Sequence, residues 1–170
     1  VDGPEARAVL IADLKKQKSF CIDLETTSLD PKVAEIVGLA CSYAAHTGFY
    51  VPFPEDSTAS RAVLGEFTEL LEDPGIEIVG HNLKFDLGVL KWHGVSAGAR
   101  IFDTLLAHFL AEPEMRHKMD YLAEVYLGYA PIGIDALIGD KESGQISMRD
   151  VPVEQAAEYA AEDADITWQL

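Results

Sequence analysis

Hydrophobic and polar positions change their spacing several times along this chain. Residues 4–16 carry apolar side chains at helical spacing, with a proline near the start and two lysines at the end, as helix termini favour. The apolar runs at 20–24, 35–44 and 48–53 are typical of strands, and a hairpin is predicted around His46-Thr47-Gly48. We therefore expect one helix followed by three antiparallel strands.

The rest of the chain alternates between helical and strand patterns. Helices are expected at 59–72, 83–92, 103–110, 120–127 and 154–170, short strands at 76–79 and 99–102, and a polar, mobile loop at 139–145. Strand-helix-strand alternation with short loops implies parallel strands joined by right-handed crossovers. The sequence thus predicts an α/β fold with a mixed five-stranded sheet, three antiparallel then two parallel strands, flanked by helices on both faces. The opening strand should lie in its centre.

Length and composition fit one domain. The chain has 170 residues, 48% of them hydrophobic, which suffices for a sizeable core. No apolar run approaches the length of a membrane span, so we expect no membrane contact. The chain begins at Val1 and ends at Leu170 within a helical pattern. We expect residues 1–170 to be a single domain excised from a longer protein, and a monomer by itself.

The charge balance is strongly acidic. Thirteen basic residues against 29 acidic ones give a formal net charge of −16. This sign opposes binding of nucleic acid through its phosphates. Any role on nucleic acid must therefore be local and metal-assisted, or must depend on a basic neighbour.

Cysteines and histidines give no sign of a metal centre. Cys21 and Cys41 lie in apolar segments without metal-type spacing, so we expect buried thiols, in keeping with a cytoplasmic location. The five histidines show no ligand spacing either, and no zinc site is expected.

Two acids follow one another at the end of the opening strand. Side chains alternate between the faces of a strand, so Asp23 and Glu25 point one way, while Ile22 and Leu24 point the other. Neighbouring carboxylates repel unless a proton or a cation lies between them. A hard dication such as Mg²⁺ or Mn²⁺ would relieve this repulsion. An acidic surface turn after a strand is the alternative, and the short pattern alone favours it.

Further polar residues follow the strand predicted at 76–79. Asn82 and Asp86 are four residues apart where this strand passes into a helix, which is the edge of an α/β sheet where ligands bind. Asn82 capping the helix, and Asp86 favouring its positive N-terminus, are the structural alternatives. Asp103 ends the next strand. Capping a helix is its expected role, with a supporting role behind the site as the alternative.

A third group lies in the last helix. Tyr159 and Asp163 are four residues apart and differ by roughly 40° around a helix, whereas Glu162 and Asp165 project elsewhere. The alanines at 156, 160 and 164 would let this helix approach the sheet closely. A solvated acidic helix is the alternative.

Together, Asp23-x-Glu25, Asn82-x-x-x-Asp86 and Tyr159-x-x-x-Asp163 resemble the three exonuclease motifs of the DEDD superfamily, in the subtype with tyrosine. The histidine subtype would require histidine at position 158, which is a glutamate. The stretches 23–30, 79–86 and 159–165, with 102–104 and 119–122, are similar to the proofreading domain of family A DNA polymerases, and the similarity covers nearly the whole chain.

The resemblance implies a ribonuclease H-like fold and a 3′-5′ exonuclease. It would release nucleoside monophosphates from single-stranded DNA 3′ ends with two divalent ions, Mg²⁺ or Mn²⁺. The implied metal ligands are Asp23, which bridges both ions, Glu25 and Asp163 at the water-activating ion, and Asp86 at the second. Tyr159 would orient the attacking water through its hydroxyl, since a phenol with a pKa near 10 is a poor base at neutral pH.

The resemblance also implies contacts with the substrate. Leu29 would wedge against the terminal base from an exposed turn, and Asn82 would contact the terminal nucleotide. Ile134 is a candidate second wedge, and Thr26 and Phe85 complete the substrate-binding candidates. The implied partner is a covalently linked polymerase domain.

Two alternatives to a proofreading exonuclease stay open. An RNA-trimming exonuclease like ribonuclease D shares the tyrosine subtype, and the sequence does not show how a ribose 2′-hydroxyl is received. A catalytically silent domain that supports a polymerase is the other. The presence of all four acids and the tyrosine speaks against it.

Overall fold

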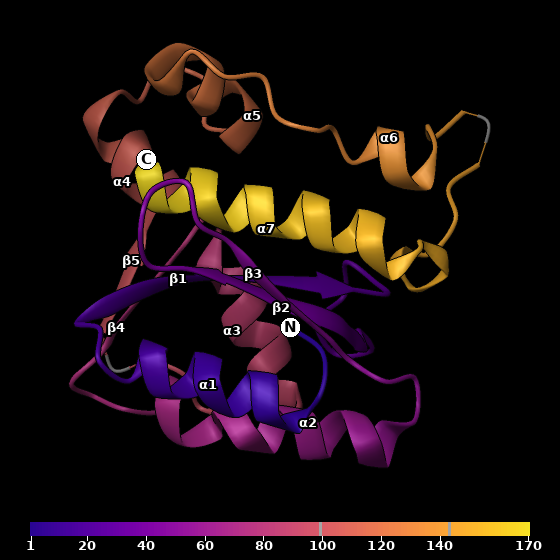
Figure 1. The fold of residues 1–170 in the computed structure, drawn as a ribbon. Coiled ribbons are helices and arrows are strands. Elements are labelled where there is room, and N and C mark those ends of the chain that lie inside the picture. Colours follow the sequence, from indigo (N-terminus) through magenta and orange to yellow (C-terminus); the bar gives the residue numbers. More distant parts are fainter. Residues whose placement is uncertain (99, 143) are drawn as a thin grey trace.

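A mixed five-stranded sheet organises the molecule (Figure 1). The computed structural model describes residues 1–98, 100–142 and 144–170. The strands are β1 (Ser19–Thr26), β2 (Ile36–Ser42), β3 (Phe49–Pro52), β4 (Glu77–Gly80) and β5 (Arg100–Asp103), in the order β3-β2-β1-β4-β5. β1 pairs antiparallel with β2 and parallel with β4. β3 pairs antiparallel with β2, and β5 pairs parallel with β4. The predicted topology is confirmed, including the central place of the opening strand; Ala99 of the predicted strand 99–102 lies outside the described residues.

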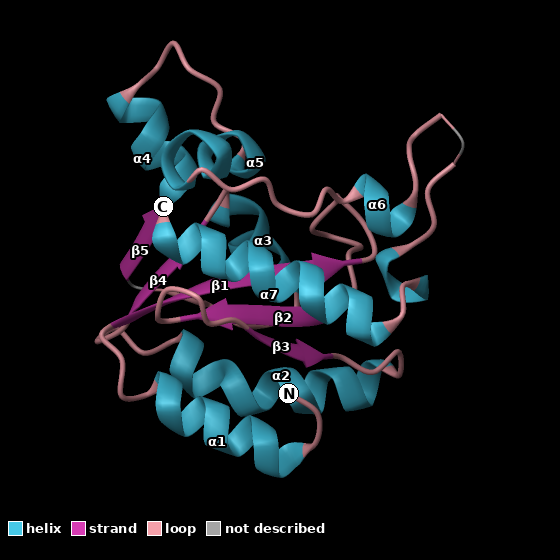
Figure 2. Ribbon diagram, turned by 45° about the horizontal axis from the view of Figure 1, so that its top comes forward, coloured by secondary structure: helices cyan, strands magenta, loops and turns pink. Residues whose placement is uncertain are grey.

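Helices cover both faces of the sheet, as predicted (Figures 1 and 2). On one face lie α1 (Pro4–Leu14), α2 (Ser57–Leu71) and α3 (Leu83–Trp92), which share the larger hydrophobic core with β1, β2 and β3. The other face is covered mainly by α7 (Val153–Gln169), which shares the smaller core there with Met148 and Val151. The predicted helix limits lie within two residues of the observed ones at these four helices.

Successive side chains of β1 point alternately into the two hydrophobic cores, one on each face of the sheet. Ile22 and Leu24 belong to the core under α1, α2 and α3, whereas Cys21 belongs to the smaller core under α7. Both cysteines are buried free thiols, as expected. Asp23 and Glu25 therefore point toward α7.

α7 lies close to the sheet because its contact face is made of small residues. The alanines at 156, 160 and 164 are fully buried against the sheet. Gly48 at the start of β3 lies against the helix, and a Cβ there would overlap the carbonyl group of Ala161. The predicted close approach is confirmed.

The segment between β5 and α7 passes along the outer side of α7 (Figure 1). It contains α4 (Thr104–Ala111), α5 (Met119–Leu122), a π-helical turn (Ala123–Leu127), α6 (Asp135–Ile138) and a 3-10 turn (Met148–Asp150). The predicted helix at 120–127 is therefore α-helical over residues 120–122 and π-helical over residues 123–127. It ends at Gly128 in the left-handed region, φ 66°, where Tyr129 donates its N–H to the Ala123 carbonyl.

Two short helical turns of this segment were not predicted, and one predicted loop lies partly outside the described residues. α6 and the 3-10 turn are single turns, too short for a periodic pattern to reveal. The predicted loop at 139–145 contains Ser143, which is outside the described residues; its described part is free of helix and strand. In the described chain, no helix combines the length and apolar character needed to cross a membrane.

Candidate active site

β1 presents the first two acids on the face covered by α7. Glu25 lies opposite Gly38 of β2 and is only 7% exposed. The Tyr50 ring lies over Gly38, where a Cβ would overlap it. Burial and the nearby Glu25 carboxylate both raise the pKa of Tyr50. Because Gly38 has no side chain, the Tyr50 ring has room to lie beside Glu25.

Asp86 reaches β1 from the first turn of α3. The ladder between β1 and β4 covers only Ser19 to Cys21, so the Leu24 N–H lies beyond the end of β4. Asp86 Oδ1 accepts this N–H at 3.1 Å. The Asp86 carboxylate thus accepts the backbone N–H that a neighbouring strand would otherwise accept, at the residue between Asp23 and Glu25.

Asp103 holds the turn that leads into α3. It accepts the N–H groups of Asn82 and Leu83 at 3.0 and 2.9 Å, and those of Leu105 and Leu106 at 3.0 and 3.3 Å. One carboxylate thus caps both α3 and α4, and the predicted capping role of Asp103 is confirmed. The alternative that Asn82 caps α3 is wrong. Its side chain makes no capping hydrogen bond, and its backbone is in the left-handed region with φ 65°.

α7 contributes Tyr159 and Asp163 from its sheet-facing side. Asp163 is 6% exposed, and its Oδ1 is buried without a hydrogen-bond partner in the described structure. Burial raises the pKa of Tyr159, and the Asp163 charge and a hydrogen bond to Asp163 raise it further. An unpaired buried carboxylate oxygen is costly, which points to a missing cationic or protic partner.

The four carboxylates form one electrostatic cluster. Burial raises the pKa of Asp23 to about 6 and that of Asp163 to about 8, the latter with a further contribution from the Asp23 charge. The pKa values of Glu25 and Asp86 are also raised, first by burial and then by the Asp23 charge. Such a cluster favours protons or a cation over free carboxylates.

The oxygen-only set of donors fits a hard dication. In the described residues, however, no three His, Cys, Asp or Glu side chains are arranged to hold a metal ion. Asp86 Oδ1 instead accepts the Leu24 N–H. The fit therefore rests on the donor chemistry and the unpaired Asp163 oxygen.

The substrate-binding candidates occupy different surroundings. Leu29 is 92% exposed in the loop after β1, and Asn82 is also exposed. Thr26 is half-buried and donates to the Ser28 carbonyl at 3.0 Å, which shapes that loop. Ile134 and Tyr159 pack against the core under α7, whereas Phe85 packs against the core on the other face. Of these five, Ile134 is therefore the one that shares a core with Tyr159.

Two acids near the site were not selected from the sequence. Asp120 of α5 lies close enough to Asp163 for its charge to raise the pKa of that carboxyl. The 119–122 similarity was a signal that could have found it. Glu162 accepts hydrogen bonds from Tyr129 and Ile132, 33 and 30 residues away in the sequence, which spacing alone does not reveal.

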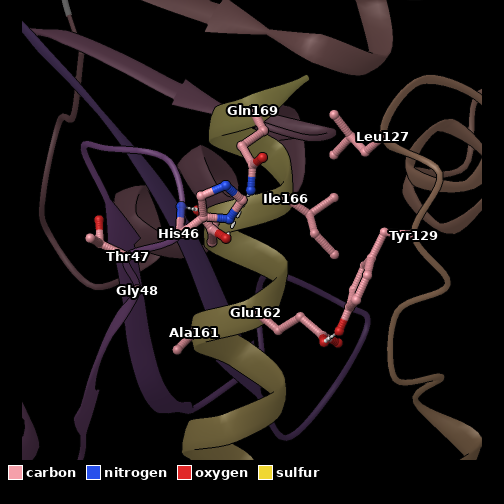
Figure 3. Close-up of a pocket in the computed structure, with 10 residues that line it drawn as sticks. His46, Thr47, Gly48, Leu127, Tyr129, Ala161, Glu162, Ile166 and Gln169 are labelled. Atoms are coloured by element: carbon pink, nitrogen blue, oxygen red, sulfur yellow. Dashed lines mark hydrogen bonds between the residues drawn. The ribbon is translucent and has the colours of Figure 1, made fainter.

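A cavity of about 460 Å³ lies along the C-terminal half of α7 (Figure 3). Figure 3 shows the hairpin tip on one side of the helix and Tyr129 on the other, with Tyr129 pointing at Glu162. The lining residues are His46, Thr47, Gly48, Leu127, Tyr129, Ala161, Glu162, Asp165, Ile166 and Gln169. None of the predicted catalytic residues lines this cavity.

Comparison with known proteins identifies the family. The 3′-5′ exonuclease family matches residues 1–170. DNA polymerase I of Borreliella burgdorferi is 33% identical over 164 residues, which cover 95% of this chain and 18% of the relative. DNA polymerase I of Pseudomonas aeruginosa is 35% identical over 166 residues, which cover 92% of this chain and 18% of the relative. The chain thus spans 18% of the length of these curated relatives.

Solved structures of similar fold include two ribonuclease H-like nucleases. Brucella melitensis NrnC bound to pGG has a TM-score of 0.74 at 21% identity, with 92% of this chain and 71% of that chain covered. NrnC is also known with bound Mg²⁺. RNase D of Escherichia coli has a TM-score of 0.71 at 19% identity, with 98% of this chain and 41% of that chain covered. These likenesses confirm the predicted fold. The family match and the polymerase relatives show that the chain is a nuclease of the 3′-5′ exonuclease family found in bacterial DNA polymerase I.

Proposed function

We propose that this chain removes nucleotides from single-stranded DNA 3′ ends as the proofreading domain of a DNA polymerase, using two divalent ions. The observation that carries the proposal is the cluster of four buried or half-buried acids with raised pKa values, contributed by β1, α3 and α7. A protein bears the cost of such a cluster where a cation is to be bound.

Asp23, Glu25, Asp86 and Asp163 would hold the ions. When bound, divalent ions supply an activated water and neutralise charge on the reacting phosphate. Metal use in the family and the Mg²⁺ bound by NrnC support this assignment. The unpaired Oδ1 of Asp163 supports it from within the chain.

Tyr159 would orient the attacking water. Its pKa is raised well above the ordinary value, so the hydroxyl keeps its proton at neutral pH. A protonated hydroxyl donates and accepts hydrogen bonds but does not act as a base. Its place beside Asp163 suits a water that attacks next to that acid.

Leu29, Asn82 and Ile134 would contact the terminal nucleotide. Leu29 and Asn82 are exposed on the loops that follow β1 and β4, at the same edge of the sheet as the acids. An exposed apolar side chain at this edge suits stacking against a base. Thr26 would act through the shape of its loop. Phe85 would act through the packing of α3, with no contact of its own with the base.

A linked polymerase domain would deliver the substrate. The curated relatives are DNA polymerase I proteins far longer than this chain, which supports such a domain. The net charge of −16 leaves the chain poorly suited to attract DNA by itself.

The central test is Asp23→Ala. We expect this variant to lose Mg²⁺-dependent shortening of a labelled single-stranded oligonucleotide, because it removes the acid central to the cluster. Glu158→Ala removes an exposed acid of α7 and should keep the activity. Unchanged shortening by Asp23→Ala would disprove the proposal.

An RNA substrate is the second candidate, favoured by the likeness of the fold to RNase D. Matched DNA and RNA oligonucleotides decide between them, and faster cleavage of RNA would favour this candidate. A silent domain would show no Mn²⁺ binding in calorimetry at millimolar metal.

A further inference from the structure

Residues 129–134 cross the outer side of α7 as irregular backbone between the π-helical turn and α6; we call them the strap. The Tyr129 hydroxyl donates to Glu162 Oε1, and the Ile132 N–H donates to Glu162 Oε2 at 2.7 Å. Each oxygen of one α7 carboxylate thus holds one point of the strap, and Figure 3 shows the first of these contacts. Hydrogen bonds to a charged acceptor are stronger than neutral ones.

The strap ends at Ile134, on the face of the sheet that α7 covers. Ile134 packs against the core under α7 together with Leu137 of α6 and with Tyr159. Glu162 directly precedes Asp163 and follows Tyr159 by three residues on the same helix. The carboxylate that holds the strap is therefore fixed to the element that carries two of the proposed catalytic residues.

Few other contacts within the described chain fasten the strap. Ala130 and Gly133 are exposed. The strap pairs with no strand of the described sheet. The backbone hydrogen bonds at its two ends stay within the same segment. At one end the Tyr129 N–H donates to Ala123, and at the other the carbonyls of Gly133 and Ile134 accept N–H groups of α6. Glu162 thus provides the polar connection between the strap and α7.

We propose that Glu162 is a positioning residue, which fastens the strap to α7 and so keeps Ile134 against the core that it shares with Tyr159, for contact with the 3′-terminal nucleotide. The inference rests on the proposed function, because the contact of Ile134 with substrate belongs to it. Loss of the fastening should weaken substrate binding while leaving the acids and their chemistry in place.

The test compares Glu162→Ala, Glu162→Gln and Tyr129→Phe in this chain. Glu162→Ala should raise KM for a single-stranded oligonucleotide about tenfold with kcat within about twofold, as expected for lost binding contacts. Glu162→Gln retains an acceptor oxygen and should recover part of the loss. Tyr129→Phe removes one hydrogen bond but no charge, and should raise KM by about threefold to fivefold.

Amide hydrogen exchange provides a readout that does not depend on activity. The Ile132 N–H should exchange at least about tenfold faster in Glu162→Ala than in the original chain, because its acceptor is gone. Glu158→Ala, which removes an exposed charge from the same helix, should change neither KM nor this exchange rate. Since Tyr129 and Glu162 act through one bond, the double variant should show less than the product of the single effects on KM.

The outcomes separate the two proposals. An unchanged KM in Glu162→Ala would overturn the positioning role. An equal rise of KM in Glu158→Ala and Glu162→Ala would also overturn it, and would indicate a charge effect. Unchanged exchange of the Ile132 N–H would overturn the fastening itself. If the original chain fails to shorten the oligonucleotide, the proposed function fails, while the exchange experiment still decides whether Glu162 fastens the strap.

Discussion

Burial and a neighbouring charge both disfavour the ionised form of Asp163. Its pKa is raised to about 8 by burial and by the Asp23 charge, and one of its oxygens is unpaired. In the unfolded chain the same carboxyl has a pKa of about 3.9. The folded chain thus binds a proton over a pH range in which the unfolded chain has lost it.

This difference predicts a pH dependence of stability. The folded-state pKa is raised, so the stabilising contribution is complete below pH of about 4 and is lost as the pH rises toward about 8. Without divalent metal, the melting temperature of the original chain relative to Asp163→Asn should fall by about 5 °C or more over this range. Differential scanning calorimetry in a chelator measures it. Added Mg²⁺ should reverse most of the fall at pH 8, and parallel pH profiles of the two proteins would contradict the prediction.

Gly38 offers a second prediction for a single residue. A Cβ at position 38 would overlap the Tyr50 ring beside Glu25, so Gly38→Ala must displace that ring. We expect the free energy of unfolding to fall by about 1–3 kcal/mol, as for other overpacked cores.

Gly65→Ala is the matched control for Gly38→Ala. Gly65 lies inside α2, where a Cβ meets open space, so the same change should stabilise the chain by about 0.5–1 kcal/mol. Urea denaturation of both variants tests the pair. Equal effects of the two substitutions would show that the Tyr50 contact has no role.

At the scale of elements, Asp103 joins two helices to one strand end. Its carboxylate accepts four backbone N–H groups, two at the start of α3 and two at the start of α4. It also secures Asn82, whose positive φ costs about 1 kcal/mol in a residue other than glycine. The position of Asp86, one turn along α3, depends on this arrangement.

Asp103→Ala should therefore cost more than the loss of an ordinary helix cap. We expect the free energy of unfolding to fall by about 2–4 kcal/mol, because two helix termini lose their acceptors. Asp56→Ala removes a cap that holds α2 alone, through the Ala59 N–H at 2.8 Å, and should cost about 1 kcal/mol. Chemical denaturation measures both. Similar losses would mean that one of the two termini contributes little.

Elements were predictable from sequence where a periodic pattern or a strong local residue defines them. The alternation along β1 correctly assigned Ile22 and Leu24 to one face, and it gave the direction of Asp23 and Glu25. Single turns such as α6 leave no periodic signal. The contacts of Glu162 join residues about 30 positions apart, so they arise from tertiary packing that no local pattern encodes.

At the scale of the whole molecule, the charge of −16 opposes binding of DNA. The four acids of the proposed site account for only part of this excess, so metal binding would leave a repulsive surface. Proteins that neutralise several phosphates lose affinity steeply as salt rises, because they release counterions. A chain that makes few such contacts should depart from this behaviour.

We therefore expect weak binding with a shallow salt dependence. In this chain, Asp23→Ala, used to prevent cleavage, should bind a fluorescent single-stranded oligonucleotide with a dissociation constant above about 10 μM at about 150 mM salt. Raising the salt from about 50 to about 200 mM should change the constant less than tenfold, against the loss of roughly 300-fold expected when about six phosphates of a single strand are contacted. Fluorescence anisotropy measures both quantities. Submicromolar binding at the higher salt would show that the acidic chain carries its own DNA-binding surface, and that delivery by a linked basic domain is unnecessary.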